Sequence, residues 1–301
     1  MGGLTERVRL FLNMKIYIDG DFYEENEAKI SVFDHGLLYG DGVFEGIRFY
    51  GGRVFRLEEH IDRLYSSARA ILLEIDVSAQ QMTEAVLQTI RENGLQDGYV
   101  RLVVTRGQGS LGLSPQSCPK PSVIVIASDI QLYSDEKYRD GLVLVTCSTR
   151  RPTPASISPQ VKSLNYLNNV MAKIEAQRGG GEEGLMLNEQ GFVAECTGDN
   201  IFIARNGVVS TPPISAGSLD GITRKVAMEL LAKQGVACVE ENLTRYDIYT
   251  CDECFLTGTA AEVIAAVELD GRVIGDGKPG KITNACVAGF RELVKSEGTN
   301  I

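Results

Sequence analysis

Residues 185–210 read LMLNEQGFVAECTGDNIFIARNGVVS, and this stretch decides the fold class. Its short apolar runs are separated by turn-forming residues at 188–191 and by Asn206-Gly207, a pair that favours the tight turn of a β-hairpin. We therefore expect two consecutive hairpins with antiparallel strands. A simple doubly wound parallel sheet does not accommodate them, because parallel neighbours need a long crossover.

Helices and strands alternate on both sides of this stretch. The apolar periodicity and the turn residues predict helices at 57–71, 78–93, 164–178, 222–235 and 282–295. They predict further strands at 15–18, 48–56, 99–106, 123–128, 142–147, 237–240, 254–257 and 262–268. This order indicates an α+β fold.

The chain is long enough for two domains. Polar residues at 131–136 suggest an interdomain linker, so we expect a small α+β domain at 14–130 and a large domain at 137–301. Residues 1–13 precede the first clear strand pattern, and we interpret them as an N-terminal extension.

Composition argues against several classes of protein. The 301 residues carry a formal net charge of −10 and no block of Lys and Arg, which argues against a nucleic-acid partner. The longest apolar runs, at 122–128 and 141–147, are too short to cross a bilayer, so we expect no membrane association. Seven cysteines at irregular spacing form no disulfide framework. A reduced cytoplasm is the expected location.

The glycine-rich run GQGSLG at 107–112 suggests a function that its surroundings do not support. It matches the fingerprint of dinucleotide-binding proteins, which requires a helix to begin at the glycines. Pro115, Pro119 and Pro121 prevent that helix. We expect a flexible loop instead.

The residues that usually bind metals are too sparse for a metal site. Cys251 and Cys254 form a Cys-x-x-Cys pair, but no second pair at suitable spacing completes a zinc site, and two ordinary thiols entering a strand are expected. The chain has only two histidines, His35 and His60, so a Ser-His-Asp triad or a His-rich site is poorly supported. We predict no metal.

Three features could carry chemistry, although each has an ordinary structural explanation. The run SLDGITR at 218–224 opens a helix and could bind a phosphate, or it could be a simple capped helix start. Tyr99 and Arg101 share one face of a strand and suit carboxylate recognition, or that face could point to solvent. The small-residue turn LTGTAA at 256–261 could present N–H groups to an anion, although alone it is weak evidence.

Lys162 lies just before a predicted helix, and its spacing alone does not mark it as catalytic. An isolated lysine is usually a solvated charge.

Six segments in order nevertheless resemble one family, the fold-type IV enzymes that depend on pyridoxal 5'-phosphate. The segments are DHGLLYGDGVFEGIR at 34–48, FRLEEH at 55–60, VKSLNYLNN at 161–169, ECTGDNIF at 195–202, GITR at 221–224 and GTAAE at 258–262. The group contains the branched-chain and D-amino-acid aminotransferases and aminodeoxychorismate lyase. The resemblance implies a small N-terminal domain and a larger cofactor-binding domain with a mixed, barrel-like sheet.

The resemblance also implies roles for individual residues. Lys162 would form the Schiff base with the cofactor, and Glu195 would face the pyridine nitrogen and keep it protonated. The other implied cofactor contacts are Arg56, Ile222, Thr223 and Thr259 at the phosphate, Tyr166 at the phenolic oxygen, and Leu219 and Gly198 beside the ring. A neutral lysine could then take the α-proton of the substrate and return it one atom along.

The segment Tyr99-Val100-Arg101 resembles the branched-chain aminotransferases in particular. In those enzymes the tyrosine and a turn matching Thr259-Ala260 bind the α-carboxylate, and the arginine binds the distal carboxylate of glutamate. The other implied substrate contacts are Tyr39, which would assist the arginine, Phe44 as apolar wall, and Tyr133 from the linker.

We therefore expect an aminotransferase that moves the amino group of L-leucine, L-isoleucine or L-valine to 2-oxoglutarate by a ping-pong mechanism, as at least a homodimer. A D-amino-acid or (R)-amine transaminase and aminodeoxychorismate lyase remain alternatives. Lys162 and Tyr166 are four positions apart, a spacing that also occurs in D-amino-acid relatives, and Asp220 stands where proline is common. These departures concern the substrate range.

Overall fold

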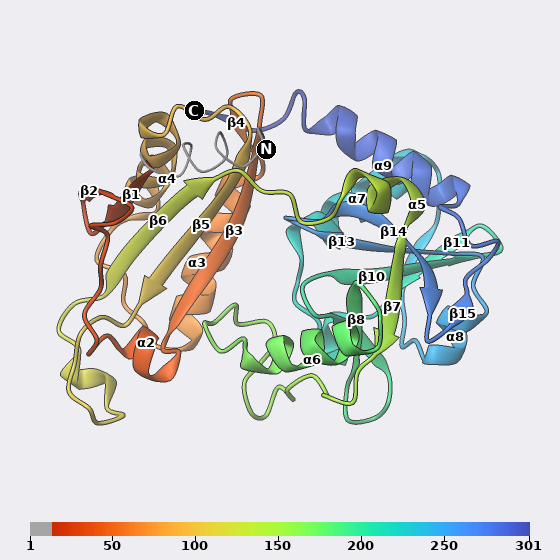
Figure 1. Cartoon of the computed structure of the whole chain (residues 1–301), viewed down its shortest axis with the longest axis horizontal. Helices are drawn as coiled ribbons and strands as arrows, with labels where there is room; N and C mark the ends of the chain where they lie inside the picture. Colours follow the sequence, from red (N-terminus) through yellow and green to blue (C-terminus); the bar gives the residue numbers. More distant parts are fainter. Residues whose placement is uncertain (1–13) are drawn as a thin grey trace, which may run out of the picture. The chain divides into compact units, whose positions relative to one another are not determined.

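The computed structural model describes residues 14–301, so the expected N-terminal extension at 1–13 lies outside the described residues. The chain forms two compact units, each built around its own sheet (Figure 1). Unit 1 contains the described residues up to Ile130 together with Val161–Asn165 and Glu297–Ile301. Unit 2 contains Gln131–Gln160 and Tyr166–Ser296. The prediction assigned 161–165 and 297–301 to the large domain, whereas their contacts place them in unit 1.

Unit 1 is a seven-stranded antiparallel sheet in the order β16-β4-β3-β5-β6-β1-β2. Its strands are β1 (Lys15–Ile18), β2 (Asp21–Glu24), β3 (Gly42–Tyr50), β4 (Arg53–Val54), β5 (Gly98–Thr105), β6 (Ser122–Ser128) and β16 (Thr299–Asn300). Its helices are α2 (His35–Tyr39), α3 (Leu57–Ala70) and α4 (Ala79–Glu92), with a single 3₁₀ turn, η2, at Pro115–Ser117.

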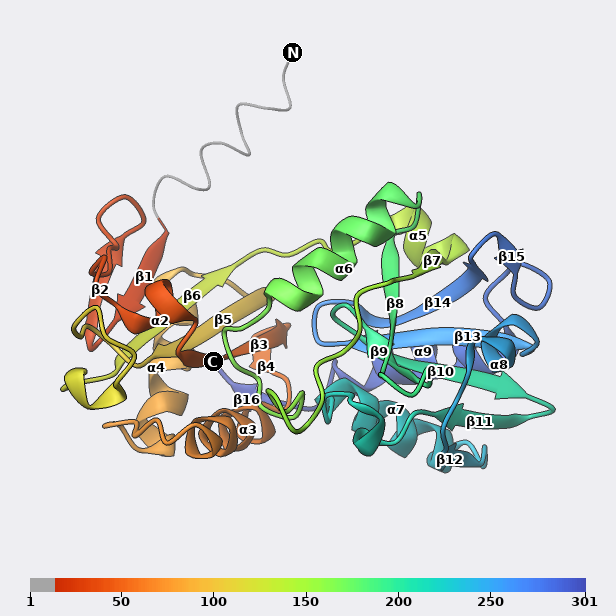
Figure 2. The ribbon, with the colours of Figure 1, turned by 90° about the horizontal axis from the view of Figure 1, so that it is seen from below.

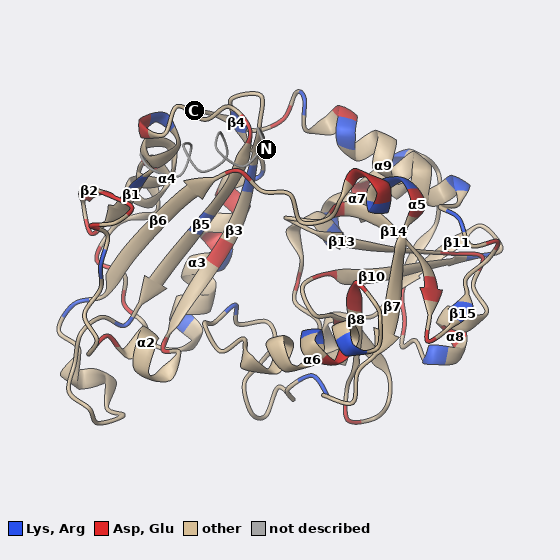
Figure 3. Cartoon of the chain, viewed as in Figure 1, with Lys and Arg blue, Asp and Glu red and all other residues tan. Residues whose placement is uncertain are grey.

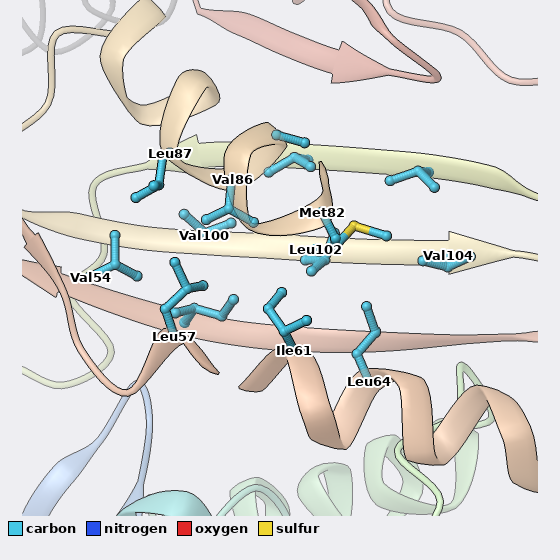
Figure 4. Close-up of a cluster of buried hydrophobic side chains, with 14 of the residues drawn as sticks. Val54, Leu57, Ile61, Leu64, Met82, Val86, Leu87, Val100, Leu102 and Val104 are labelled. Atoms are coloured by element: carbon cyan, nitrogen blue, oxygen red, sulfur yellow. The ribbon is translucent and has the colours of Figure 1, made fainter. Parts of the chain in front are cut away.

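The core of unit 1 lies between this sheet and helices α3 and α4. Figure 4 shows Leu57, Ile61 and Leu64 of α3 beside the strands, with Met82 and Val86 of α4 above them. Alternate residues of β3, β5 and β6 point into this core. The opposite face of β3 and β5 is therefore free to carry polar and aromatic groups.

A short segment from much later in the chain lies along β3. Val43 and Ser163 form an isolated antiparallel bridge, and the Leu164 N–H donates to the Gly42 carbonyl over 2.9 Å. The predicted helix at 164–178 accordingly begins later, as α6 (Leu167–Arg178), because residues 162–164 are extended beside β3.

Unit 2 contains a nine-stranded mixed sheet in the order β12-β11-β10-β13-β14-β7-β8-β9, with β15 paired to β14. Its strands are β7 (Leu142–Thr146), β8 (Glu183–Leu187), β9 (Val193–Cys196), β10 (Asn200–Arg205), β11 (Val208–Thr211), β12 (Cys238–Glu240), β13 (Glu253–Gly258), β14 (Glu262–Leu269) and β15 (Arg272–Val273). Figure 2 shows β10, β13 and β14 running side by side. A three-residue turn at 197–199 joins the edge strand β9 to the interior strand β10. The sheet must therefore curl, as the expected barrel-like sheet does.

Helices and 3₁₀ turns cover this sheet. They are α5 (Asp135–Asp140), α6, η3 (Ile214–Ala216), α7 (Ile222–Lys233), α8 (Arg245–Tyr249) and α9 (Lys281–Leu293). Helix α6 packs on β8, whereas α7 and α9 contact each other and β13 and β14. Within residues 14–301, no helix combines the length and the apolar character that crossing a bilayer requires. Figure 3 shows acidic and basic residues interspersed on each unit, without an extended basic face in this view.

Candidate active site

One face of the sheet in unit 1 gathers the substrate-binding candidates from β3 and β5. Tyr99 and Arg101 project from the face opposite the core, as strand alternation predicts, and Gly46 lies directly across from Arg101. Arg101 Nη2 donates to Tyr99 Oη over 3.1 Å, and its guanidinium lies 4.6 Å from the centroid of the Phe44 ring. The phenol and the guanidinium are thus held together beside an aromatic wall.

Gly46 leaves the space that the Tyr99 hydroxyl occupies. A Cβ at this position would lie 1.9 Å from Tyr99 Oη, which is shorter than any non-bonded contact. Any other residue would displace the phenol from its place beside Arg101.

The extended segment beside β3 brings Lys162 to the same group of residues. Its carbonyl accepts from the Phe44 N–H over 3.0 Å, and its N–H donates to Ser67 Oγ over 3.2 Å. Lys162 Nζ lies 4.5 Å from the Phe44 ring centroid, so Lys162 and Arg101 share one aromatic ring. Unit 1 therefore combines an amine that can attack a carbonyl carbon with groups that can bind a carboxylate.

Beneath Lys162, a charged cluster lies in the otherwise apolar core. Glu45 is fully buried and accepts from His60 Nδ1 over 2.7 Å, and from Arg63 Nε and Nη2 over 2.7 and 2.8 Å. Burial alone would raise the pKa of Glu45, but the charge of Arg63 and the hydrogen bonds from Arg63 and His60 lower it to about 2. Burial lowers the pKa of His60; Glu45 opposes this effect, and the charges of Arg63 and Lys162 add to it. His60 is thus neutral, and Glu45 is ionised.

Two arginines of unit 1 differ in their distance from Lys162. Arg56, the predicted phosphate ligand, caps the start of α3 and pairs with Glu59 and Glu297, each over 3.1 Å. Ser67 of α3 binds the Lys162 N–H and therefore marks the part of the helix nearest Lys162. Along the axis of α3, Arg63 lies one turn, about 6 Å, from Ser67, whereas Arg56 lies about 16 Å from Ser67. The sequence analysis did not single out Arg63. Its spacing from His60 and Ser67, three and four residues on one helix face, was the available clue.

Helix α2 joins the glycine-rich loop at 107–112. The Tyr39 hydroxyl donates to the Leu111 carbonyl, and His35 Nε2 lies 2.7 Å from the Ser110 carbonyl oxygen. After these glycines the structure has the single turn η2 rather than the long helix that a dinucleotide fingerprint requires. Tyr39 therefore belongs to a small surface element made by α2 and this loop.

Unit 2 holds Glu195 at the end of β9 among buried donors. Glu195 Oε1 pairs with Arg151 Nη2 over 2.8 Å, and Oε2 accepts from Asn200 Nδ2 over 3.1 Å and from the Leu219 N–H over 3.0 Å. Glu195 is 6 % exposed and Arg151 7 %. The carboxylate is therefore paired with a cation, held in one orientation and largely shielded from water.

The start of α7 offers the predicted phosphate cradle. Gly221 brings no side-chain cap, and the first N–H groups of a helix, here from Ile222 and Thr223, have no partner within the helix. A Cβ at Gly221 would lie 2.0 Å from Asn200 Oδ1, so only glycine permits this close approach. Asn200 Nδ2 also bonds the Leu219 carbonyl over 2.9 Å, so one side chain connects Glu195 with the approach to α7.

These residues fit a phosphorylated pyridine. A Cβ built on the exposed Gly198 meets nothing within 4 Å, which leaves open space beside the turn that follows Glu195. Thr257 Oγ1, at the end of β13 and next to the Thr259-Ala260 turn, is buried without a hydrogen-bond partner in the described structure. Unit 2 thus supplies an anion-binding helix end, a buried carboxylate and an unsatisfied hydroxyl.

The remaining predicted residues of unit 2 lie in two places. Thr259 and Ala260 form the half-buried turn between β13 and β14, and Tyr166 is the half-buried residue that precedes α6. Tyr133 contacts the core of unit 2, and its hydroxyl lies 3.4 Å from Glu183 Oε2. Burial raises the pKa of Tyr133. Its hydroxyl is thus engaged within unit 2 in this structure.

The cysteines form no site. All seven have free thiols, and residues 14–301 contain no cluster of three or more His, Cys, Asp or Glu arranged to hold a metal. Burial raises the pKa of Cys251 to about 12 and raises that of Cys254 well above its usual value. Both thiols therefore stay protonated near neutral pH.

Comparisons with known proteins agree with this chemistry. The sequence pattern of the family described as class IV aminotransferases matches residues 42–269. A Methanocaldococcus jannaschii protein, provisionally named a branched-chain-amino-acid aminotransferase, is 50% identical over 96% of this chain and 99% of its own length. The crystal structure of the Escherichia coli branched-chain amino acid aminotransferase superposes with a TM-score of 0.91 at 33% identity, and covers 94% of this chain and 95% of that one. The branched-chain aminotransferase of the thermophilic archaeon Thermoproteus uzoniensis, solved with norvaline, gives a TM-score of 0.88 at 37% identity, over 93% of this chain and 94% of that one.

Proposed function

Because the chain belongs to the class IV aminotransferases, we propose that it moves the amino group of L-leucine, L-isoleucine or L-valine to 2-oxoglutarate with pyridoxal 5'-phosphate as cofactor. The observation that carries this proposal is the shared face of unit 1, where Arg101 and Lys162 lie over the Phe44 ring and Arg101 also bonds Tyr99. An aromatic wall suits a branched aliphatic side chain. The guanidinium suits the second carboxylate of glutamate.

The proposed residues of unit 2 and those of unit 1 have different roles. In unit 2, Glu195 would meet the ring nitrogen of the cofactor, Leu219 and Gly198 would flank the ring, and Ile222, Thr223 and Thr259 would hold the phosphate. Tyr166 would bond the phenolic oxygen. When bound, pyridoxal 5'-phosphate supplies an electron-withdrawing ring that stabilises the charge left on the substrate carbon after it loses its proton.

Unit 1 would supply the proton transfer and most of the substrate contacts, and unit 2 would add the Thr259-Ala260 turn and Tyr133. Lys162 would attach the cofactor, and its amine, once released, would take the α-proton of the substrate and return it one atom along, a role that typically accelerates a reaction by about 10²–10⁴-fold. Tyr99, together with the Thr259-Ala260 turn, binds the α-carboxylate. The apolar contacts come from Phe44, Tyr39 and Tyr133. The sequence predicts that Arg56 binds the cofactor phosphate. The structure favours Arg63 for this role, because Arg63 lies closer on α3 to Ser67, which binds Lys162.

We also propose that the working form is a homodimer in a reduced cytoplasm. Large apolar side chains stand exposed on α2 and the neighbouring loop: Val32 is 68%, Leu37 60%, Leu111 68% and Leu113 78% exposed. An apolar surface of this kind marks a protein contact, and a second copy of the chain is the proposed partner. Size-exclusion chromatography with light scattering should give twice the chain mass, and a monomer at micromolar concentration would contradict the proposal. The free thiols agree with a reducing compartment.

The cofactor is tested by absorbance. Purified protein reconstituted with pyridoxal 5'-phosphate should absorb near the edge of the visible range, and Lys162→Ala should abolish this absorbance and reduce transamination by at least about 10²-fold. Lys295→Ala is the matched control, because that lysine is exposed and belongs to a surface ion pair. Normal absorbance in Lys162→Ala would remove the proposed role of this lysine.

The substrate is tested with a panel of amino donors. L-leucine should be preferred to D-alanine with 2-oxoglutarate as acceptor. A preference for D-alanine would favour a D-amino-acid transaminase. Pyruvate released from aminodeoxychorismate without an acceptor would favour a lyase.

A further inference from the structure

Arg151 is an arginine buried in the core of unit 2 that the proposed mechanism does not use. It lies between β7 and α6, and its N–H donates to the Leu187 carbonyl over 3.0 Å. Its guanidinium contacts three separate segments: Glu195 Oε1 over 2.8 Å, Asn169 Oδ1 over 3.0 Å and the Gly217 carbonyl over 3.2 Å. The side chain is thus fixed from three directions.

Asn169 links Arg151 to the turn that follows Glu195. Its Nδ2 donates to the Thr197 carbonyl over 2.7 Å, and Asn169 is 8 % exposed. Arg151 and Asn169 together therefore hold both Glu195 and the start of the turn at 197–199. A displacement of Arg151 would move the carboxylate and this turn together.

Stability alone does not account for a buried ion pair of this kind. Removing two charges from water costs several kcal/mol per ion in general, and well-packed apolar residues often do as well or better. The pair does have a direct chemical consequence for Glu195. A guanidinium stays protonated at every pH at which proteins function, so it favours the ionised carboxylate and opposes transfer of a proton to it.

We propose that Arg151 is a positioning residue that keeps Glu195 ionised and correctly aimed, so that the proton shared with the cofactor resides on the ring nitrogen. The inference rests on the proposed function, because it assumes that Glu195 meets that nitrogen. Arg151 acts through Glu195 and contacts neither substrate nor cofactor in this scheme.

The test compares Arg151→Met, which removes the charge, with Arg151→Lys, which keeps it. Arg150→Met is the matched control, because Arg150 is the exposed neighbour with the same charge. The full-length chain is reconstituted with pyridoxal 5'-phosphate, and three quantities are measured: the cofactor dissociation constant, the midpoint of the pH-dependent change in cofactor absorbance, and the thermal midpoint of the apoprotein.

A protonated ring nitrogen withdraws electrons and lowers the proton affinity of the nitrogen that joins the cofactor to Lys162. Arg151→Met should therefore raise the absorbance midpoint by about one pH unit, within the range that a neighbouring opposite charge produces. Its cofactor affinity should fall by about 10- to 100-fold, the usual effect of losing the residue that supports a ligand. The absorbance midpoint and the cofactor affinity of Arg151→Lys should lie closer to the wild-type values than those of Arg151→Met. Both quantities in Arg150→Met should equal the wild-type values.

An unchanged absorbance midpoint in Arg151→Met would overturn the inference, even if the apoprotein lost thermal stability, because that result describes a purely structural residue. If Arg151→Met does not fold, Arg151→Gln, which retains donors but no charge, is judged by the same criterion. Cofactor binding and transamination of L-leucine by the wild-type chain are measured before any variant. Failure of either would refute the proposed function itself.

Discussion

Replacing Glu45 with glutamine removes the only carboxylate that contacts both His60 and Arg63 in the described structure of unit 1. The pKa of Glu45 is about 2 in the folded chain, against 4.5 for a free side chain. The folded chain therefore binds fewer protons than the unfolded chain as the pH falls, and Glu45 stabilises the fold above pH 4.5. The difference corresponds to about 3 kcal/mol at neutral pH, of which about 1 kcal/mol is lost between pH 6 and pH 3.5.

The assay is urea unfolding of the apoprotein at fixed protein concentration, followed by circular dichroism at several pH values from 7 to 3.5. The difference in unfolding free energy between wild type and Glu45→Gln should shrink by about 1 kcal/mol over the acid half of this range. Glu58→Gln, a change of the same kind at an exposed position of α3, should give a small difference at every pH. A wild-type minus Glu45→Gln difference that stays constant with pH would refute the proposed ionisation of Glu45.

Three further predictions concern the site in unit 1. If Arg63 is the phosphate ligand, as its position on α3 favours, Arg63→Ala should weaken cofactor binding by at least about tenfold in a titration of the apoprotein, and Arg56→Ala should have less effect. A larger loss of affinity in Arg56→Ala would instead identify Arg56 as the phosphate ligand. In steady-state kinetics, Arg101→Met should raise KM for glutamate by about 10- to 100-fold and change KM for leucine by less than about threefold. Equal changes in KM for both substrates would exclude a specific role of Arg101 at the distal carboxylate of glutamate. Gly46→Ala places a methyl group 1.9 Å from Tyr99 Oη, so kcat/KM should fall by about 10²-fold for every amino donor while the thermal midpoint changes little. Unchanged kinetics of Gly46→Ala would show that Tyr99 can move without consequence.

Local rules predicted the elements that local residues control. The helix predicted at 78–93 forms as α4, which begins after the capping box of Ser78 and Gln81, and Asn206-Gly207, both with positive φ, turns the predicted hairpin between β10 and β11. Helix α7 begins at Ile222, as the GITR pattern indicated. In each case the signal lies within a few residues of its effect.

Contacts between distant parts of the chain account for the misses. Residues 163 and 164 lie just before α6, but they pair with β3 about 120 residues earlier, and no local pattern predicts this pairing. Among single residues, His60 lies on the buried face of α3 and binds Glu45, a contact that the amphipathic pattern of the helix does not reveal. Glu45 itself, a charge within the apolar run VFEGI, was the overlooked indication that a buried partner existed.

The division of unit 1 among three separate pieces of sequence bears on how the protein is made. When synthesis has reached only Ile130, β3 lacks the neighbour supplied by Val161–Asn165, and β4 lacks its partner β16. The nascent sheet thus has open edges that can pair with other chains. A recombinant fragment that stops at Ile130 should aggregate, and the sheet of unit 1 is completed only after unit 2 has been synthesised.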